Sequence, residues 1–378
     1  MQFILPENIN YVIDTLQNAG FKAYIVGGCV RDILCNKTPH DFDITTSALP
    51  ENIQMLFPKT VDTGIKHGTV TVIADGTPIE VTTFRTEGQY IDHRRPESVE
   101  FVSDVERDLS RRDFTVNAMC YNPKEGLIDL FGGRDDIQRG VLRAVGDPAL
   151  RFSEDALRIL RLVRFAATLG FTPDSNTLKA AKECKDGLRE VSAERIFVEL
   201  KKASMGNNFE PLNEIIMCGA LEHLGIINPV NDSLTRLEPI ENLRLFAFLN
   251  QISCDISGTL KALKCSNKFY NYCSLLKEIT PPDTRYDIKK LLNRAGYDIV
   301  CDYARLSEET DKIIPVVQNI IDNGEAYKLS HLKISGQDIA RLGFSGEEIG
   351  QKLEFLLDLV MRNPELNTRE NLIKLISN

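Results

Sequence analysis

The sequence predicts an α+β protein, with a mixed sheet near the N-terminus and helices over the rest of the chain. Strand-like and helix-like segments alternate over roughly the first 140 residues. From about residue 150, long amphipathic runs with a 3.6-residue period replace them, and no convincing strand appears among these runs. The chain has 378 residues, more than one hydrophobic core usually supports, so two or more domains are expected.

The expected elements follow one another in a simple order. The N-terminal region contains a strand in FKAYIVGG, a helix in NIQMLF and further strands in GTVTVIA, PIEVTTFR and VEFVSD. The helical region contains the amphipathic runs EDALRILRLVRFAATLG, SAERIFVELKKAS, LTRLEPIENLRLFAFL and EEIGQKLEFLLDLVM. Turn-forming residues at 281–287 and 329–338 indicate joints inside the helical region.

Bulk composition excludes several classes of protein. A hydrophobic content of 43% is ordinary for a globular chain and argues against a disordered or fibrous one. No stretch approaches roughly 18 uncharged apolar residues, and the N-terminus has no signal-peptide pattern, so we expect no membrane span, no secretion and a cytoplasmic location. The nine cysteines are scattered and never arranged as CxxC, which argues against a disulfide framework or a zinc site.

Charge is unevenly distributed along the chain. The net charge of -9 is unusual for a protein that binds nucleic acid, because lysine and arginine usually supply such affinity. Residues 139–202, however, contain 13 lysines and arginines against nine aspartates and glutamates, a local balance of +4. Local charge is what a phosphate group experiences. This region is therefore a candidate nucleic-acid contact, although a solvated helical surface with mixed charges explains it equally well.

An acidic pair follows the first predicted strand. Asp41 and Asp43 are two residues apart on an expected second strand, and alternation along a strand would put both carboxylates on one face. Such oxygens can hold Mg²⁺, whose other positions are taken by phosphate oxygens and water. Glu80 is the expected third acid, because a lone carboxylate in an apolar strand is costly to bury without a partner. A DxD triplet alone is also common in solvated turns.

Two glycines strengthen the metal-site interpretation. Gly27 and Gly28 come after an apolar strand and before an expected helix, where bare backbone can approach a phosphate group. Arg31 adds a cation one turn later. A tight strand-to-helix turn that needs glycine is the alternative explanation. GGxxRD followed by DxD is nevertheless much more specific than either motif alone.

An arginine-rich helix is the second candidate site. FSEDALRILRLVRF predicts a helix with Ser153 at its N-cap and acids in the first turn, which the helix macrodipole favours. Arg158, Arg161 and Arg164 lie among apolar residues, where each needs an anionic partner. Asp155 precedes the first two of these arginines by three and six residues, so the three side chains can face one ligand. Arg164 would lie on the opposite side of the helix from Asp155.

Asp155 and Arg158 are a candidate base-selecting pair. An aspartate beside an arginine complements the edge that cytosine and adenine share, where an amino donor adjoins a ring-nitrogen acceptor. Uracil and guanine present a carbonyl oxygen and an N–H at these positions. They would leave buried polar groups mispaired, a penalty large enough to discriminate strongly.

Five motifs occur in order over roughly residues 24–200, namely GGCVRD, HDFDITTSALP, RRDFTVNAM, RFSEDALRILRLVRFA and SAERIFVEL. They resemble the successive motifs of the class II CCA-adding tRNA nucleotidyltransferase and bacterial poly(A) polymerase family. The C-terminal run LKISGQDIARLGFSGEEIGQKLEFLLDLV resembles that family less specifically, and residues 205–325 show little resemblance.

The resemblance implies a domain organisation. The N-terminal part would be a polymerase-β-like nucleotidyltransferase head with a mixed sheet, and the rest an all-helical neck, body and tail. We expect the catalytic head at 1–140, the neck with the nucleotide-selecting helix at 141–205, the body at 206–285 and a tRNA-binding tail at 286–378.

The resemblance also implies a reaction and its residues. Mg²⁺ bound by Asp41 and Asp43, with Glu80 as a third acid, would assist attack of the tRNA 3′-hydroxyl on the α-phosphate of CTP or ATP, with release of pyrophosphate. The residues expected to bind the nucleotide are Gly27, Gly28, Arg31, Arg112, Asp113, Asp155, Arg158, Arg161 and Arg164. The helical part would grip the tRNA by its shape and phosphates.

Two family assignments concern RRDFTVNAM. Arg112 would contact the nucleotide, and Asp113 would lie near the ribose, where a carboxylate that accepts from the 2′-hydroxyl favours ribonucleotides. An acid that caps a helix is an equal alternative for Asp113. Asn117 is expected to support this segment rather than contact the substrate.

The polar stretch FRTEGQYIDHRRPESVEFV predicts a mobile loop that closes over the site, with an exposed hairpin as the alternative. In the resembled family, CCA-adding and A-adding enzymes carry a flexible element here, often with an acid and an arginine a few residues apart. Asp92 and Arg95 fit that description. The sequence therefore resembles enzymes that are able to add the terminal A.

Other functions stay open at this point. An A-adding tRNA nucleotidyltransferase and a poly(A) polymerase share all the motifs above. A non-catalytic RNA-binding protein on a degenerate transferase fold is disfavoured by intact Asp41, Asp43 and Asp155. A transferase that acts on a small molecule is disfavoured because such an acceptor does not need so large a helical region. The sequence does not indicate an oligomeric state.

Overall fold

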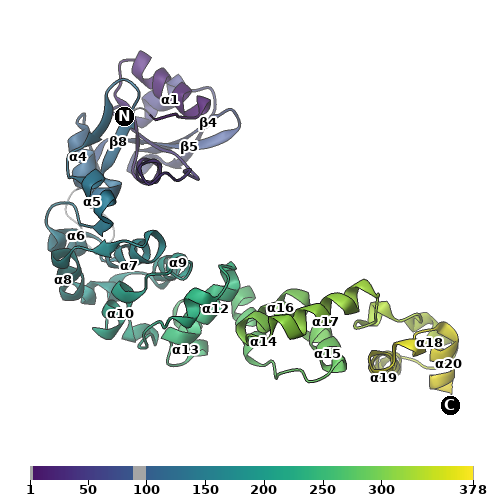
Figure 1. Cartoon of the computed structure of the whole chain (residues 1–378). Helices are drawn as coiled ribbons and strands as arrows, with labels where there is room; N and C mark the ends of the chain where they lie inside the picture. The colour runs from purple at the N-terminus through teal and green to yellow at the C-terminus, as the bar shows by residue number, and fades with distance from the viewer. Residues whose placement is uncertain (1–2, 88–98, 378) are drawn as a thin grey trace. The chain divides into compact units, whose positions relative to one another are not determined.

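The computed structural model describes residues 3–87 and 99–377 (Figure 1). Contacts within the chain separate two compact units. The first consists of Met1–Thr235 with Phe248–Cys265, and the second of Arg236–Ala247 with Ser266–Asn378. The division into head, neck, body and tail at the boundaries expected above stays a prediction.

A seven-stranded mixed sheet organises the N-terminal part of the first unit. Its central strands β2 and β5 are parallel, and the other neighbours are antiparallel. Two small sheets accompany it, one of β6 (Arg85–Glu87) with β7 (Val99–Phe101), the other of β10 (Val141–Leu142) with β11 (Thr172–Pro173). In spatial order the large sheet contains β3 (Thr60–Gly64), β4 (Thr69–Ala74), β5 (Thr77–Thr83), β2 (Asp43–Thr46), β1 (Ala23–Val26), β8 (Met119–Asn122) and β9 (Gly126–Asp129).

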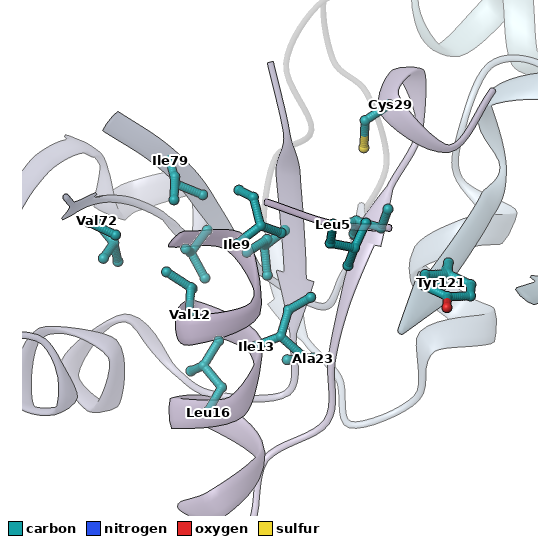
Figure 2. Packing of buried hydrophobic residues seen from close by; sticks show 14 of the residues in the cluster. Leu5, Ile9, Val12, Ile13, Leu16, Ala23, Cys29, Val72, Ile79 and Tyr121 are labelled. Atoms are coloured by element: carbon teal, nitrogen blue, oxygen red, sulfur yellow. The ribbon is translucent and has the colours of Figure 1, made fainter. Parts of the chain in front are cut away.

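Strand β1 is buried on both faces, which explains its uninterrupted apolar sequence AYIV. Ala23 and Ile25 pack into the larger core, against the apolar stripe of the N-terminal helix α1 (Glu7–Asn18), which Figure 2 shows from close by. Tyr24 and Val26 point to the other face, where they pack with Leu109 of α4 (Val105–Ser110). Alternation along the strand thus ties both faces of the sheet to helices.

Some of the remaining helices of the first unit lie between strands in the sequence, and the later ones form a helical region. The α-helices are α2 (Gly28–Leu34), α3 (Pro50–Leu56), α5 (Gly133–Arg139), α6 (Pro148–Glu154), α7 (Leu157–Leu169), α8 (Ser175–Glu183), α9 (Ala193–Ala203), α10 (Glu210–Met217) and α13 (Ile256–Ala262). Short 3₁₀ turns are η1 (Ile65–His67), η2 (Thr115–Asn117), η3 (Lys185–Glu190) and η4 (Glu222–Leu224). Helices α11 (Ser233–Arg236) and α12 (Glu241–Ile252) contribute residues to both units.

The second unit is helical throughout its described residues. One apolar cluster lies within α15–α17, and another lies between α18, α19 and α20. The buried Lys289 of α15 joins them, because its Nζ donates to the carbonyl of Met361 at 3.0 Å and lies 2.6 Å from a Glu325 oxygen. The elements are α14 (Asn267–Lys277), α15 (Arg285–Ala295), α16 (Tyr297–Leu306), α17 (Thr310–Asp322), η5 (Leu329–His331), α18 (Gly336–Arg341), α19 (Glu347–Arg362), η6 (Pro364–Leu366) and α20 (Arg369–Ser377).

These features confirm the predicted fold class, a mixed N-terminal sheet followed by helices. None of the helices in the described residues combines the length and the apolar character needed to traverse a bilayer. All nine cysteines are free thiols, and Cys254 is exposed.

The predicted helix start at Ser153 is wrong. One helix, α6, begins earlier at Pro148 and ends at Glu154, and a second helix, α7, begins at Leu157. Asp147 caps α6 by accepting from two backbone N–H groups, and Pro148 at the first helical position fits that start better than Ser153 does. Ser153 lies in the last turn of α6, where its hydroxyl donates to the Leu150 carbonyl at 2.8 Å.

Candidate active site

The turn between β1 and α2 brings bare backbone to one end of the central strands of the sheet. Gly27 has a φ of +78°, a conformation that L side chains rarely adopt, and a Cβ there would come within 3.0 Å of Nη1 of Arg112. Gly28 follows as the first residue of α2. The backbone conformation therefore requires glycine at position 27, and a larger residue would also displace the end of the Arg112 side chain.

Asp43 and Glu80 lie side by side on neighbouring central strands, near the same end of β1. Asp43 is the first residue of β2, and the parallel register pairs it with Glu80 of β5. Asp41 precedes the strand by two residues, so the expectation that both aspartates lie on a strand is wrong. Glu80 is exposed, so the argument from costly burial is also wrong, although the register brings Glu80 beside Asp43.

The negative charges of Asp41 and Glu80 affect the ionisation of Asp43. Asp43 is exposed, but neighbouring protein atoms still reduce the hydration of its carboxylate, and this raises its pKa to about 6. The negative charges of Asp41 and Glu80 raise the pKa further, and Arg112 opposes them. Among the described residues, none of the three carboxylates has a hydrogen-bond or ion-pair partner. This arrangement of three carboxylates favours binding of a cation.

The donor set fits a divalent metal only in part. Asp41 and Asp43, whose carboxylates have no partner in the part of the chain that the structure describes, supply the hard oxygen ligands that magnesium prefers, and phosphate oxygens and water usually complete such sites. Within residues 3–87 and 99–377, however, no group of three or more His, Cys, Asp or Glu side chains converges closely enough to hold a metal by itself. A metal here would therefore depend on ligands from the substrate.

A cavity of about 560 Å³ opens beside Asp43. Eight arginines and three aspartates contribute to its wall, a local balance of +5 (8 − 3) in a chain whose net charge is -9. The arginines are Arg31, Arg85, Arg111, Arg112, Arg158, Arg161, Arg164 and Arg195, and the aspartates are Asp43, Asp113 and Asp155. Such a wall attracts a polyanion.

The cavity gathers most of the residues that the sequence singled out. Asp41 and Glu80 are not part of its wall. The predicted residues that are part of it are Gly27, Gly28, Arg31, Asp43, Arg112, Asp113, Asp155, Arg158, Arg161 and Arg164. Asp92 and Arg95 lie outside the described residues.

Asp113 is held by several donors. Its Oδ2 lies 2.6 Å from Nε and Nη2 of Arg161, and its Oδ1 accepts from Asn117 at 3.3 Å and from the backbone N–H of Phe114 at 2.8 Å. Burial alone would raise the pKa of Asp113, but Arg161 and these donors outweigh it and lower the pKa to about 2. The capping alternative for Asp113 is wrong, since the N-cap of η2 is Phe114.

Asn117 also holds Arg31, because its Oδ1 accepts from Nη1 of that arginine at 2.6 Å. One amide thus connects a cation of α2 to the carboxylate of Asp113. This agrees with the supporting function expected for Asn117.

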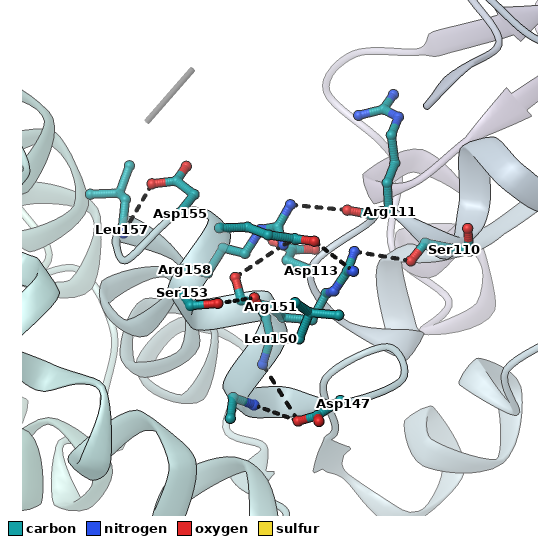
Figure 3. A network of polar contacts seen from close by, with 12 residues as sticks. Ser110, Arg111, Asp113, Asp147, Leu150, Arg151, Ser153, Asp155, Leu157 and Arg158 are labelled. Atoms are coloured by element: carbon teal, nitrogen blue, oxygen red, sulfur yellow. Dashed lines mark hydrogen bonds and ion pairs between the residues drawn. The ribbon is translucent and has the colours of Figure 1, made fainter. Parts of the chain in front are cut away.

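Asp155 and Arg158 have separate partners. The carboxylate of Asp155 accepts from the backbone N–H of Leu157 at 3.1 Å and from Nη2 of Arg195 at 2.7 Å. The buried Arg158 lies 2.6 Å from Glu154 and donates to the carbonyls of Arg151 and Arg111 (Figure 3). Because Asp155 ends α6 in an extended conformation, the predicted single-helix stripe is wrong, although both side chains still face one cavity.

Arg164 faces the same cavity, although the single-helix geometry put it on the far side. Its guanidinium carbon lies 3.9 Å from the centre of the Phe165 ring, and its Nε lies 3.0 Å from Glu199 of α9. Burial lowers the pKa of Arg164 to about 10. Arg31 and Arg161 lie 5.2 and 5.4 Å from the same ring centre, so one phenylalanine groups three cations.

Sequence reasoning missed four residues of this region. Asp108 is fully buried and lies 2.8 Å from Arg111 and 3.3 Å from Arg112, so it orients two arginines of the cavity wall. Arg85, Arg111 and Arg195 belong to that wall as well. An acid one helical turn before the RR pair, and an arginine inside SAERIFVEL, were the available indications.

Two protein-family models match the chain. A model described as the poly A polymerase head domain matches residues 23–143, which contain the sheet and the acidic pair. A model described as a probable RNA- and SrmB-binding site of polymerase A matches residues 170–225.

Whole-chain relatives decide the family. The CCA-adding enzyme of Streptococcus sanguinis is 38% identical over 363 residues, which cover 91% of this chain and 90% of that protein. The chain belongs to the family of CCA-adding enzymes. The CCA-adding enzyme of Lactobacillus helveticus is 36% identical over 373 residues, which cover 93% of this chain and 91% of that protein.

A solved structure extends the CCA-adding family assignment to the fold. The Bacillus stearothermophilus CCA-adding enzyme, in complex with CTP, has a TM-score of 0.83 and 29% identity, and covers 98% of both chains. The resemblance, the fold class and the enzyme class expected from the sequence are thereby confirmed: the protein is a nucleotidyltransferase. Membership of this family implies use of a divalent metal ion.

Proposed function

We propose that this protein adds the nucleotides C, C and A, from CTP and ATP, to the 3′ end of tRNA without a nucleic-acid template, and releases pyrophosphate. The observation that carries the proposal is one cavity in which the acid Asp43, the base-selecting candidates Asp155 and Arg158, and an excess of arginines meet. Similarity to CCA-adding enzymes over about nine-tenths of the chain supports it.

The metal of this reaction would be Mg²⁺, held by Asp41 and Asp43. When bound, it would stabilise charge on the phosphate oxygens and favour ionisation of the attacking 3′-hydroxyl. Glu80 would support Asp43 from the neighbouring strand and add negative charge to the site. Asp43, the one of these three acids that belongs to the cavity wall, would then hold the metal beside the reacting α-phosphate.

The triphosphate would lie against the arginines grouped around Phe165. Arg31, Arg161 and Arg164 share this ring, and each also has one carboxylate partner, which is Asp32, Asp113 and Glu199 respectively. The excess of arginines over aspartates in the cavity wall would attract a ligand with several negative charges. The bare backbone at Gly27 and Gly28 leaves room for a phosphate to approach closely.

The base would be selected by Asp155 and Arg158. Asp155 would accept from the exocyclic amino group of cytosine or adenine, and Arg158 would donate to the adjacent ring nitrogen. Arg112 would contact the nucleotide from the side of the sheet, and Asp113 would lie near the ribose. Because Asp113 is already bound by Arg161 and Asn117, the 2′-hydroxyl would use its remaining acceptor capacity.

A product analysis tests the function. The full chain is incubated with Mg²⁺, CTP, ATP and tRNA that ends before CCA, and products are resolved by length and base. Addition of C, C and A followed by a stop supports the proposal. Addition of A alone, or a tail that grows without limit, would instead support an A-adding enzyme or a poly(A) polymerase, and RNA binding without any addition would support a non-catalytic protein.

Two further parts of the proposal concern cell biology and RNA binding. The reaction uses soluble nucleotides and tRNA, so we propose a cytoplasmic location. The second unit would bind tRNA through its shape and phosphate backbone rather than by reading bases.

A further inference from the structure

Helix geometry does not fix the direction in which the side chain of Asp155 points. This residue ends α6 with φ -141° and ψ 101°, and α7 does not begin until Leu157. Regular helix positions fix where a side chain points, but an extended residue between two helices has no such constraint. A carboxylate that selects bases must nevertheless be held in one orientation, because selection depends on which atoms face each other.

Two donors supply this orientation. The backbone N–H of Leu157 donates to Oδ1 at 3.1 Å, and Nη2 of Arg195 donates to Oδ2 at 2.7 Å. Contacts at both oxygens fix the plane of the carboxylate. Each oxygen can accept a second hydrogen bond, so capacity for a ligand remains.

Arg195 is built into the same cavity. It projects from α9, which packs against α7, and it forms part of the cavity wall. Its second terminal nitrogen, Nη1, is buried and has no hydrogen-bond partner among the described residues. An unpaired charged donor is costly to bury. Arg195 thus contacts Asp155 through Nη2, while its Nη1 stays unsatisfied within residues 3–87 and 99–377.

We propose that Arg195 is the positioning residue for base selection: it holds the Asp155 carboxylate as a fixed acceptor, so that an amino group is accepted there and a carbonyl oxygen is refused. This inference rests on the proposed function. A carboxylate free to rotate could turn away from the carbonyl of uracil or guanine, which would remove the clash between two acceptors. Without Arg195, the enzyme loses discrimination rather than its chemistry.

The test compares base discrimination in full-length variants. With tRNA that lacks part of CCA, kcat/KM is measured for CTP against UTP and for ATP against GTP. Arg195→Gln is expected to lower both ratios by about tenfold to a hundredfold, the range that loss of a charge-assisted hydrogen bond supports. Arg195→Lys keeps a cation but not the planar fork, so its ratios should fall between those of Arg195→Gln and the unchanged protein.

Arg143→Gln is the matched control. Arg143 also forms a close ion pair with an aspartate, 2.6 Å from Asp174, and it does not belong to the cavity wall. Its removal should leave both ratios at their original values.

The outcomes are distinguishable. If Arg195→Gln lowers kcat/KM equally for all four nucleotides and leaves both ratios unchanged, the positioning function is overturned. If the glutamine variant does not fold, ratios in Arg195→Lys equal to those of the unchanged protein would overturn it. Absence of addition by the unchanged protein overturns the proposed function and this inference together.

Discussion

Oδ2 of Asp113 lies 2.6 Å from both Nε and Nη2 of Arg161, and this ion pair ties the segment before η2 to helix α7. Asp113 comes from the part of the chain that forms the sheet, and Arg161 from the arginine-rich helix. The pair therefore joins the two regions that, in the proposed function, both contact the nucleotide.

This ion pair predicts a pH dependence of stability. The folded protein lowers the pKa of Asp113 from 3.8 to about 2, so the pair stabilises the fold above the ordinary pKa and the stabilisation is lost as the pH falls toward 2. Asp113→Asn should lower the free energy of unfolding by roughly 2 kcal/mol near neutral pH. Urea denaturation at several pH values checks this, since the difference from the unchanged protein should shrink in acid. A difference that stays constant with pH would contradict it.

Asp108 predicts a larger loss of stability than a surface acid. It is fully buried between Arg111 and Arg112, so Asp108→Asn should lower the free energy of unfolding by about 3 kcal/mol. Glu183→Gln is the control, because Glu183 lies 3.9 Å from Lys179 with both side chains well exposed, and it should cost less than about 0.5 kcal/mol. Similar losses from the two substitutions in urea denaturation would refute the orienting function of Asp108.

The ring of Phe165 predicts a kinetic effect. Phe165→Leu removes the surface that groups Arg31, Arg161 and Arg164, so the KM for both CTP and ATP should rise by about fivefold to tenfold, with a smaller change in kcat. Phe165→Tyr keeps the ring and should stay near the original KM. Steady-state kinetics with a saturating tRNA acceptor measures both variants. If leucine and tyrosine gave the same KM, the ring would not hold these cations.

The acidic pair predicts loss of chemistry with retention of binding. Asp41→Asn or Asp43→Asn should lower the rate of incorporation by more than about a thousandfold, because several kcal/mol of charge stabilisation would be lost. CTP binding, measured by calorimetry without metal, should persist because the arginines are intact. Removal of divalent ions by a chelator should abolish incorporation, and added Mg²⁺ should restore it.

Glu80→Gln should be milder than either aspartate substitution, because Glu80 pairs with Asp43 across the sheet but does not belong to the cavity wall. Equal loss of incorporation in all three variants would make Glu80 a full member of the metal site.

The features that could be predicted from the sequence are those formed by residues close together along the chain. Gly27 and Gly28 after an apolar strand, and the acidic pair after the next helix, are local patterns, so the glycine turn and its nearby acids could be expected. The alternation of the chain from sheet to helix was equally local. These features need no knowledge of which distant segments meet.

The sequence could not predict what depends on contacts between distant segments or on competing helix starts. Arg195 meets Asp155 across 40 residues, and Asp108 reaches Thr45 across 63. Asp147 and Pro148 start a helix that ends at Glu154, so Asp155 lies in a break before α7. Because of this break, Asp155 and Arg158 face one cavity from the end of α6 and from α7, and not from one face of a single helix. The chemistry of the two side chains, which indicated them as a pair, does not depend on the break.

The most direct test of the central claim, that protein side chains choose the base, is the ratio of kcat/KM for CTP to that for UTP in Asp155→Asn, with tRNA that lacks CCA as acceptor. An amide can turn its donor toward the carbonyl of uracil, whereas a carboxylate cannot donate. We predict that the ratio falls by about a hundredfold, with measurable incorporation of U. An unchanged ratio, with CTP and UTP impaired equally, would contradict the claim.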